Sequence, residues 1–376
     1  MKKITDVNIN NKIVILRCDY NVPIKDDKIL DDTRIRKSVK TINYILERAS
    51  KLVILSHLGR ITTEEDKKEK SLRPVCDFLS KILDKKIAFC TYDEDVHTVI
   101  KNNRIVMLEN TRFFDLDNKK ESNCDDSLSK YFSSFGDIFI NDAFGVSHRE
   151  AASNVGITKY LESANGFLIE EEVNNLNRLL EKPERPYVVV MGGKKVSDKI
   201  QVINNLIKKV DKLLIGGAMA FTFLKAKGLN MGSCFVEEEY VDYAKKIIED
   251  YGEKVILLKD CYTQNKELVD INKLKSDSQG LDIGDKTIEL FKKELKDSKT
   301  IFFNGPMGLF EEGYEYGTEE LSKFLNTLDS YIVIGGGDTV NAVRKYVPNN
   351  NFIFSTGGGA SLEYLEGKRL PGIIEG

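Results

Sequence analysis

Basic side chains follow the apolar runs in the first half of the chain. Arg17 follows the first run, His57 the second and Arg112 the third. An arginine presents a planar fork of donors that suits a carboxylate or a phosphate. Just past the end of a parallel strand, such a side chain points toward the edge of the sheet where ligands bind. The pattern predicts a pocket for a small, highly charged anion, lined by Arg17, Arg34, His57, Arg60, Arg112, His148 and Arg149.

A second group of basic residues follows a glycine pair. Gly192 and Gly193 end an apolar run and precede Lys195 and Lys199. Adjacent glycines let backbone amides approach an anion, and a helix that starts there adds partial positive charge. Lys195 and Lys199 are four residues apart, so on that helix they would share a face and both reach one polyphosphate. The alternative is a solvated lysine cluster, but the position after a strand and two glycines favours a phosphate site.

Glycine ends five apolar runs in the second half. The runs are 187–191, 212–215, 300–303, 331–334 and 351–354. A single such glycine can be explained by a tight turn alone, whereas five at one edge of a sheet favour a phosphate-bearing ligand. Asp338 follows the three glycines that come after the run 331–334. It could cap a helix or hold Mg²⁺ on a nucleotide, and the residues alone favour neither.

The elements that must position these residues are strands alternating with helices. Short apolar runs at 12–16, 51–55, 104–108 and 137–140 are typical of parallel strands buried on both faces. Helical patterns lie between them, and this alternation predicts doubly wound α/β sheets. Residues 167–180 form one apolar stripe that ends before Pro183 and Pro186. We interpret this segment as a helix connecting two domains.

Length and composition agree with two unlike domains. The chain has 376 residues, enough for roughly two domains of ~150 residues. Of 27 glycines, 23 lie at or after position 166, whereas 11 of 13 arginines lie at or before Arg185. The net charge of −3 argues against a nucleic-acid surface. Apolar runs are too short to cross a bilayer, the start lacks a secretory signal, and six cysteines are scattered. We therefore expect a cytoplasmic protein with no membrane or nucleic-acid partner. We also expect a monomer, although nothing in the composition bears on the oligomeric state.

The chain resembles the phosphoglycerate kinase family along nearly its whole length. The matching segments, in order, are RCDYNVP (17–23), DDTRI (31–35), SHLGR (56–60), LENTRF (108–113), NDAFG (141–145), KVSDKI (195–200), GLDIG (280–284), NGPMGLFE (304–311), GGGDTV (335–340) and STGGGASLEYLEGKRLPGI (355–373). Several are long and specific to that family. By contrast, the chain contains neither GxxxxGK[ST] nor GxGxxG, which argues against a P-loop NTPase and a typical dehydrogenase.

The resemblance implies two doubly wound, Rossmann-like domains joined by a helix, with a cleft between them. Residues 1–165 and 362–376 would form the 3-phosphoglycerate domain, 166–186 the connecting helix and hinge, and 187–361 the domain for Mg-ADP or Mg-ATP. The activity would be glycolytic phosphoryl transfer between 1,3-bisphosphoglycerate and ADP, in line and after hinge closure, by a phosphotransferase with a carboxyl group as acceptor.

The resemblance also implies roles for individual residues. Those binding the acid substrate would be Asp19, Asn21, Arg34, His57, Arg60, Arg112 and Arg149. Those binding the nucleotide would be Lys195, Lys199, Gly216, Gly217, Gly284, Asn304, Glu311, Gly336, Gly337, Asp338, Thr339, Gly357, Gly358 and Gly359. Glu311 would hold the ribose hydroxyls, Asp338 the metal, and Arg34, Lys195 and Lys199 would stabilise the transferring phosphoryl group.

Some positions depart from the family pattern. Ile61 and Asp285 stand where proline is usual, Lys194 where alanine is usual, and Ala218 where a third glycine is usual. The sequence Leu258-Lys-Asp260 replaces PVD. Lys194, Ala218 and Asp285 lie in turns on the nucleotide side, so they bear on nucleotide affinity and preference, whereas the residues of the anion pocket are intact. The rival functions are a dehydrogenase, which the missing dinucleotide motif disfavours, and a nucleotide-binding protein that has kept the fold and lost activity, which the intact Arg34, Lys195 and Asp338 disfavour.

Overall fold

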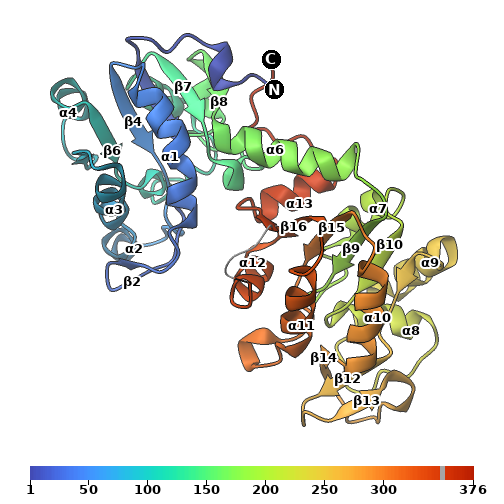
Figure 1. Ribbon diagram of the computed structural model, residues 1–376. Coiled ribbons are helices and arrows are strands. Elements are labelled where there is room, and N and C mark those ends of the chain that lie inside the picture. The colour runs from blue at the N-terminus through green and yellow to red at the C-terminus, as the bar shows by residue number, and fades with distance from the viewer. Residues whose placement is uncertain (348–351) are drawn as a thin grey trace. The chain divides into compact units, whose positions relative to one another are not determined.

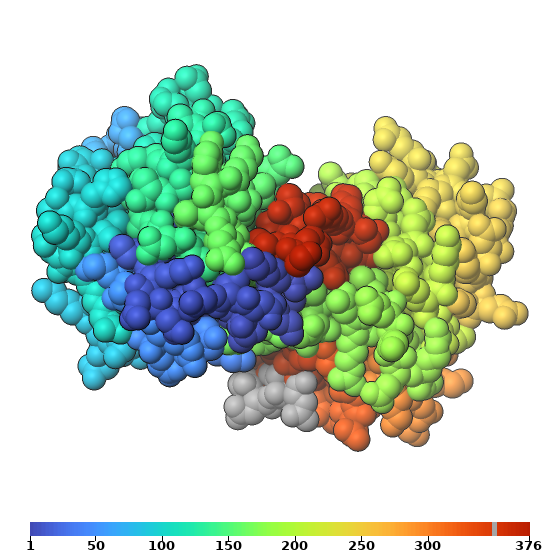
Figure 2. All heavy atoms as spheres, turned by 90° about the horizontal axis from the view of Figure 1, so that it is seen from above, coloured from blue at the N-terminus to red at the C-terminus, as the bar shows by residue number. Residues whose placement is uncertain are grey.

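The computed structural model describes residues 1–347 and 352–376 (Figure 1). It divides into two compact units, the first formed by Met1–Asn174 with Arg369–Gly376 and the second by Asn175–Lys368. Both chain ends belong to the first unit, where the amino group of Met1 lies 3.5 Å from the carboxylate of Glu375. The amino-terminal segment, dark blue in Figure 2, lies at the surface of that unit.

The first unit is built on a parallel sheet in the strand order β5-β6-β4-β1-β7-β8. Its strands are β1 Ile13–Arg17, β4 Lys51–Leu55, β5 Ala88–Cys90, β6 Ile105–Leu108, β7 Ile138–Asn141 and β8 Ser163–Asn165. A short hairpin, β2 Ile24–Lys25 with β3 Lys28–Ile29, stands apart from this sheet. Side chains alternate between the faces, so Val14 and Leu16 pack in one core and Ile15 in the other. Burial on both faces is the reason these strands are continuous apolar runs.

Helices cover both faces of this sheet. They are α1 Thr33–Leu46, α2 Glu64–Glu69, α3 Arg73–Leu83, α4 Val96–Asn102 and α5 Asp126–Ser133, with 3₁₀ turns at Ile4–Asp6, Thr111–Asp115, Phe144–Val146 and Gly156–Lys159. Residues of α1 and α3, including Ile42 and Leu79, share the core of Leu16, whereas residues of α4 and α5, including Ile100 and Phe132, share the core of Ile15. This layering confirms the predicted doubly wound arrangement.

The second unit repeats the scheme in the order β11-β10-β9-β15-β16-β17, again all parallel. The strands are β9 Tyr187–Met191, β10 Lys212–Ile215, β11 Val255–Ile256, β15 Thr300–Asn304, β16 Tyr331–Gly335 and β17 Phe352–Phe354. Asn351, the predicted first residue of the last strand, lies outside the described residues. A small antiparallel sheet, β13-β12-β14, was not predicted; its strands are β12 Asp260–Thr263, β13 Leu268–Asp270 and β14 Gly280–Ile283.

The helices of the second unit follow its strands. They are α7 Ile200–Leu206, α8 Met219–Ala226, α9 Val241–Tyr251, α10 Asp285–Leu295, α11 Tyr316–Leu325, α12 Gly337–Arg344 and α13 Gly359–Leu365, with 3₁₀ turns at Glu238–Tyr240, Ile271–Lys273 and Phe310–Glu312. Throughout the two described ranges, no helix is both long and apolar enough to cross a membrane.

The chain passes from one unit to the other inside α6, Phe167–Leu180, where the sequence indicated a connecting helix. The division falls between Asn174 and Asn175, and the return falls between Lys368 and Arg369. From the sequence, we placed this return at about Leu362. Residues of α13 stay with the second unit because this helix packs on α7, where the Asn205 amide donates to the carbonyl of Leu365 at 2.6 Å.

Candidate functional site

The basic side chains of the first unit gather at one edge of its sheet. Four neighbouring strands, β6-β4-β1-β7, run in the same direction, so their carboxyl ends share this edge. Arg112 follows β6, His57 follows β4, Arg17 ends β1, and Arg149 lies beyond β7. The chain's path reverses between β1 and β7, and such a reversal point is where open α/β sheets bind ligands.

Arg34 forms one corner of this edge. It is the second residue of α1, and its Nη1 donates to the carbonyl of Asn21 at 2.9 Å while lying 3.2 Å from a carboxylate oxygen of Asp19. The side-chain oxygen of Asn21 accepts from the backbone N–H of Gly59 at 2.9 Å. These contacts fasten the turn after β1 to the turn after β4.

Arg112 forms a second corner. The side-chain oxygen of Asn110 accepts from the N–H of Arg112 at 3.0 Å and from the N–H of Leu58 at 3.1 Å, so one buried amide holds two turns. The guanidinium of Arg112 donates to the carbonyl of Gly59. Burial lowers the pKa of Arg112, and the positive charges of Arg149 and Arg17 lower it further. Because neighbouring cations lower its pKa, Arg112 lies in a positive electrostatic field. A bound anion would be stabilised by that field.

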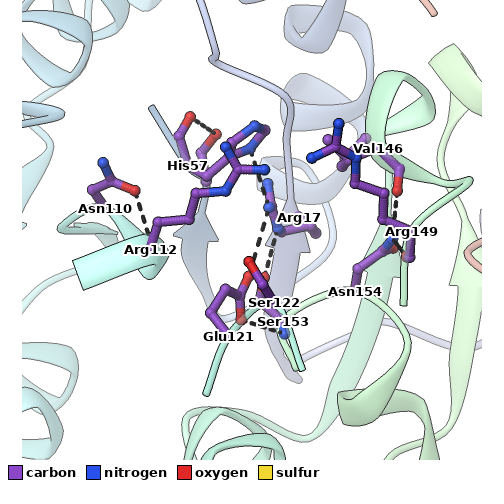
Figure 3. A network of polar contacts seen from close by, with 12 residues as sticks. Arg17, His57, Asn110, Arg112, Glu121, Ser122, Val146, Arg149, Ser153 and Asn154 are labelled. Carbon is purple, nitrogen blue, oxygen red and sulfur yellow. Dashed lines mark hydrogen bonds and ion pairs between the residues drawn. The ribbon is translucent and has the colours of Figure 1, made fainter. Parts of the chain in front are cut away.

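A buried network lies behind these side chains (Figure 3). Arg17 is 2% exposed, and it contacts the imidazole of His57 and the hydroxyl of Ser153. Burial is the largest cause that lowers the pKa of His57 well below its usual value. The positive charges of Arg17, Arg112, Arg34 and Arg149 lower the same pKa further. His57 is therefore neutral at physiological pH, and the cations around it create the positive potential of the edge.

The remaining basic residues are more accessible. Arg60 and Arg149 are exposed. The side-chain amide of Asn154 donates to the carbonyls of Val146 and Arg149, at 3.0 and 3.1 Å, and holds the turn that carries Arg149 (Figure 3). The edge thus presents exposed arginines above buried, fixed groups, an arrangement suited to a multiply charged anion.

In the second unit, the glycine turns are joined to one another. The N–H of Gly192 donates to the carbonyl of Asn304 at 2.8 Å, and the N–H of Gly193 to the carbonyl of Pro306 at 2.9 Å. Gly217 has a φ of +63°, and a Cβ there would lie 2.6 Å from backbone atoms of Gly193. The close approach of these turns is sufficient to require glycine at these positions, whether or not a phosphate binds there.

Beside these turns lies a cavity of about 350 Å³. Its apolar lining comes mainly from Ala218, Phe221, Phe235, Leu258 and Met307. Its charged lining comes from Lys194, Asp282, Glu311 and Asp338. A slot that is apolar inside and charged at a few points suits a flat ring with a polar, charged extension.

Lys199 and Asn304 form the polar centre of the same edge. The ammonium group of Lys199 donates to the side-chain oxygen of Asn304, and the Asn304 amide donates to the carbonyl of Gly335 at 2.7 Å. Burial lowers the pKa of Lys199 to about 8, while the negative charges of Asp198 and Asp338 oppose this shift. The hydroxyl of Thr339 accepts from the N–H of Gly305 at 2.7 Å and ties α12 to the turn after β15.

The prediction that Lys195 and Lys199 share a helix face is wrong. Helix α7 begins at Ile200, so both lysines precede it. The cause is Glu237, whose carboxylate accepts from the N–H groups of Val196 and Ser197 and holds this segment as a turn. Lys195 is exposed in that turn, whereas Lys199 is half-buried beside Asn304.

Asp338 does not occupy the capping position of its helix. Gly336 occupies the N-cap position of α12, and Asp338 is the second helical residue without a capping hydrogen bond. Its side chain is exposed and lines the cavity. In the parts of the chain that the structure covers, no group of three or more His, Cys, Asp or Glu residues could hold a metal. One exposed carboxylate fits a Mg²⁺ ion whose other ligands are phosphate oxygens and water.

The other predicted glycines have separate environments. A Cβ at Gly216 would lie 2.4 Å from the sulfur of Met307, and one at Gly284 would lie 2.4 Å from Asp260, so both serve packing. Gly284 is the N-cap of α10 and does not line the cavity. Gly336 has a φ of +88°, whereas a Cβ at Gly337 or Gly358 would meet nothing within 4 Å. Gly357 and Gly358 precede α13 and Gly359 is its first residue, and none of the three lines the cavity.

Sequence reasoning missed several residues that build these sites. In the first unit they are the buried Asn110, Glu121 and Ser153, and in the second the apolar lining Phe221, Phe235 and Met307. Met307 could have been inferred, because it lies within a glycine turn at the end of a strand. Of the departures from the family pattern, Lys194, Ala218 and Leu258 line the cavity and Asp285 does not.

Comparisons with known proteins agree with this architecture. The family model for phosphoglycerate kinase matches residues 4–368. Proteins named phosphoglycerate kinase from Staphylococcus epidermidis and Staphylococcus haemolyticus are each 46% identical, over 99% of this chain and 98% of theirs. A solved phosphoglycerate kinase from Coxiella burnetii is 37% identical, with a TM-score of 0.86 over 99% of this chain and 97% of the other. For that of Pyrococcus horikoshii the identity is 30% and the TM-score 0.84, with the same coverage. The chain belongs to the phosphoglycerate kinase family.

Proposed function

We propose that this chain catalyses reversible transfer of a phosphoryl group between 1,3-bisphosphoglycerate and ADP, giving 3-phosphoglycerate and ATP. The main observation behind the proposal is that, in a chain of this family, the two sheet edges offer two different chemical environments. One sheet edge holds cations around a neutral histidine, and the other holds an apolar slot beside Lys199, Asn304 and Asp338. These two environments suit the two substrates separately.

The first edge would bind 3-phosphoglycerate. Its phosphate and its carboxylate can each accept two parallel hydrogen bonds from the planar fork of an arginine, and the positive field lowers the energy of the bound anion. The residues that would hold it are Asp19, Asn21, Arg34, His57, Arg60, Arg112 and Arg149. Asp19 would act through Arg34, whose guanidinium it orients at 3.2 Å.

The second edge would bind the nucleotide. The apolar slot would take the base, Glu311 the ribose hydroxyls, and Lys195, Lys199 and the turn amides the phosphates. Asp338 would hold Mg²⁺, which neutralises phosphate charge and orients the phosphate oxygens when it is bound. The glycines at 336, 337 and 357–359 would leave their backbone amides accessible to the phosphates, in keeping with the open space beside Gly337 and Gly358.

The transfer would need no covalent enzyme intermediate. An in-line displacement is accelerated chiefly by positioning and by stabilising charge on the phosphoryl oxygens. Arg34 on the acid side and Lys195 and Lys199 on the nucleotide side would supply that charge. Removing one such donor from a water-excluded site costs about 10²–10³ in turnover in comparable cases.

Hinge closure would bring the two substrates together and exclude water, which would otherwise hydrolyse the acyl phosphate. The hinge would lie in residues 166–186. In support, the start of α6 is fastened to the first unit by Asp142, which accepts from the N–H of Leu168 at 2.8 Å. Its later residues are fastened to the second, because the hydroxyls of Tyr331 and Tyr364 donate to Asn175 and Asn177, at 3.0 and 2.7 Å. Small-angle scattering should show compaction with both substrates together, and an unchanged radius of gyration would argue against closure.

The same proposal includes a monomer in the cytoplasm, with small-molecule substrates and neither nucleic acid nor membrane as a partner. The small net charge of −3 supports the absence of a nucleic-acid partner. Sedimentation equilibrium should give the mass of one chain, and a dimer mass would refute this part.

The activity is tested by a coupled assay that follows ADP formation from ATP and 3-phosphoglycerate. The wild-type chain should require both substrates and Mg²⁺. Lys195→Ala should reduce turnover by about 10²–10³, whereas Lys293→Ala, on the exposed face of α10, should not. An equal rate of ADP formation with and without 3-phosphoglycerate would contradict the proposal.

A further inference from the structure

Arg17 is a buried cation for which the proposed function gives no role. It ends β1 and is 2% exposed. Its Nε donates to the hydroxyl of Ser153 at 2.9 Å, its Nη1 donates to the carbonyl of Cys18, and its Nη2 lies 3.3 Å from Nδ1 of His57. Because burying a charge is costly, a guanidinium held in this way calls for an explanation.

The contact with His57 fixes the proton on its imidazole ring. A guanidinium has five donors and no acceptor, and it stays protonated in proteins. Nδ1 of His57 must therefore be the acceptor, which requires a ring without a proton on Nδ1. The charges that face the ring, Arg17, Arg112, Arg34 and Arg149, all disfavour a second proton. The proton of the neutral ring then lies on Nε2.

Nε2 is the remaining polar atom of the ring. His57 is 2% exposed, and within residues 1–347 and 352–376 its Nε2 has no hydrogen-bond partner. Nε2 is nevertheless not one of the fully buried polar atoms that lack a partner, so part of its surface stays open. The ring therefore presents an unpartnered N–H at the edge where Arg34 and Arg112 lie, and such a donor is suited to an anionic oxygen.

A counter-charge keeps Arg17 in place. The Ser153 hydroxyl, which accepts from Arg17, donates to Glu121, and the Ser153 N–H donates to the same carboxylate at 3.0 Å. Glu121 is itself 2% exposed and lies 3.9 Å from Nη2 of Arg17. Figure 3 shows this chain running from His57 through Arg17 to Ser153 and Glu121. Arg17 is thus fixed from behind while it holds His57 in front.

We propose that Arg17 is a positioning residue that holds His57 as the neutral Nε2–H tautomer, so that the ring donates one fixed hydrogen bond to the acid substrate. Arg17 itself does not touch that substrate. The substrate part of this inference rests on the proposed function, whereas the tautomer does not. Two experiments therefore separate the failure of one from the failure of the other.

The first experiment reads the tautomer without any substrate. The chain has three histidines, so long-range ¹H–¹⁵N correlation spectra of histidine-labelled protein are simple, and His57→Gln identifies the His57 signals. We expect the Nε2–H pattern, unchanged between pH 6 and 8 because the pKa of His57 is lowered well below its usual value. Arg17→Met combined with Glu121→Gln, which leaves no unpaired buried charge, should convert this to a mixture of the two neutral tautomers. An Nδ1–H pattern or an imidazolium in the wild-type protein would overturn the proposal, as would an unchanged pattern in the double variant.

The second experiment tests the donor in catalysis. The side-chain nitrogen of glutamine lies near the position of histidine Nε2, whereas that of asparagine lies near Nδ1. His57→Gln should therefore retain a KM for 3-phosphoglycerate within a few-fold of wild type, and His57→Asn should raise it about tenfold or more. The KM for ATP should change in neither variant, and the exposed His97→Gln serves as the control. Equal effects of Gln and Asn, in variants with wild-type melting temperatures, would refute the donor role while leaving the tautomer result standing.

Discussion

The prediction that depends most directly on the structure concerns the proton of Lys199. Burial lowers the pKa of its ammonium group to about 8, although Asp338 lies near enough to oppose the shift. Below pH 8 the group is charged and can bind phosphate; above pH 8 the free protein loses this charge. The terminal phosphate of ADP itself titrates at about pH 6, so the comparison starts at pH 7. We expect the dissociation constant for ADP to rise above pH 8, by up to tenfold per pH unit. Because phosphate stabilises the charged form, binding above pH 8 should take up a proton.

Two substitutions separate the charge from the fold. In Lys199→Met the Asn304 amide keeps its bond to the carbonyl of Gly335 at 2.7 Å, so the polar centre stays ordered. Losing one hydrogen bond to a charged phosphate costs about 1.5–3 kcal/mol, or roughly 10- to 150-fold in affinity. Lys199→Arg keeps a charge that does not titrate, so the affinity of this variant for ADP should be independent of pH over the same interval above pH 7.

The assay is isothermal titration of ADP at several pH values, in pairs of buffers with different ionisation enthalpies. The difference between buffers reports the protons taken up on binding. Affinity independent of pH between 7 and 9.5 in the wild-type protein would refute the assignment of Lys199 to the phosphates. An affinity of Lys199→Met for ADP within threefold of the wild-type value would refute the same assignment independently.

Three further substitutions test the cavity wall, the glycine turns and the buried Asp142. Lys194→Ala removes an ammonium that lies 4.9 Å from the centre of the Phe235 ring at the cavity wall; losing this contact and charge should weaken ADP binding about two- to fivefold, with a smaller dependence on salt in a calorimetric titration. Gly217→Ala places a Cβ 2.6 Å from a neighbouring turn and should lower the melting temperature clearly more than Gly228→Ala, which shares a positive φ but meets nothing within 4 Å. Burial raises the pKa of Asp142 to about 7, so the stability that this group contributes is present below pH 4 and is lost as pH rises through 7; Asp142→Asn should flatten that part of a urea-midpoint profile against pH. Equal melting temperatures of the two glycine variants, or parallel pH profiles with and without Asp142, would contradict these assignments.

The sheets could be predicted because burial on both faces leaves a clear mark on sequence. Runs such as 13–16 and 188–190 are apolar throughout because each successive side chain enters one core or the other. The small sheet β13-β12-β14 left no such mark. Its strands are short and mix polar with apolar residues, as in Asp260–Thr263, so no run distinguishes them from loops.

The sites were predicted at the level of residues near strand ends and not at the level of their contacts. Local spacing suggested a helix carrying Lys195 and Lys199, but Glu237, some forty residues later in the chain, holds that segment as a turn. In the same way, Ser153 and Glu121 hold Arg17 across more than 100 residues of sequence. Contacts of this kind depend on how the elements pack, and periodicity within one element cannot reveal them.

The proposed reaction moves a phosphoryl group between ATP and the carboxylate of 3-phosphoglycerate on this chain. ³¹P magnetisation transfer at equilibrium, with Mg²⁺ and both substrates present, observes this movement directly. We expect exchange between the γ-phosphate of ATP and the acyl phosphate of 1,3-bisphosphoglycerate, and we expect it to be abolished when 3-phosphoglycerate is omitted. Inorganic phosphate as the only product, with no exchange into the acyl phosphate, would contradict it.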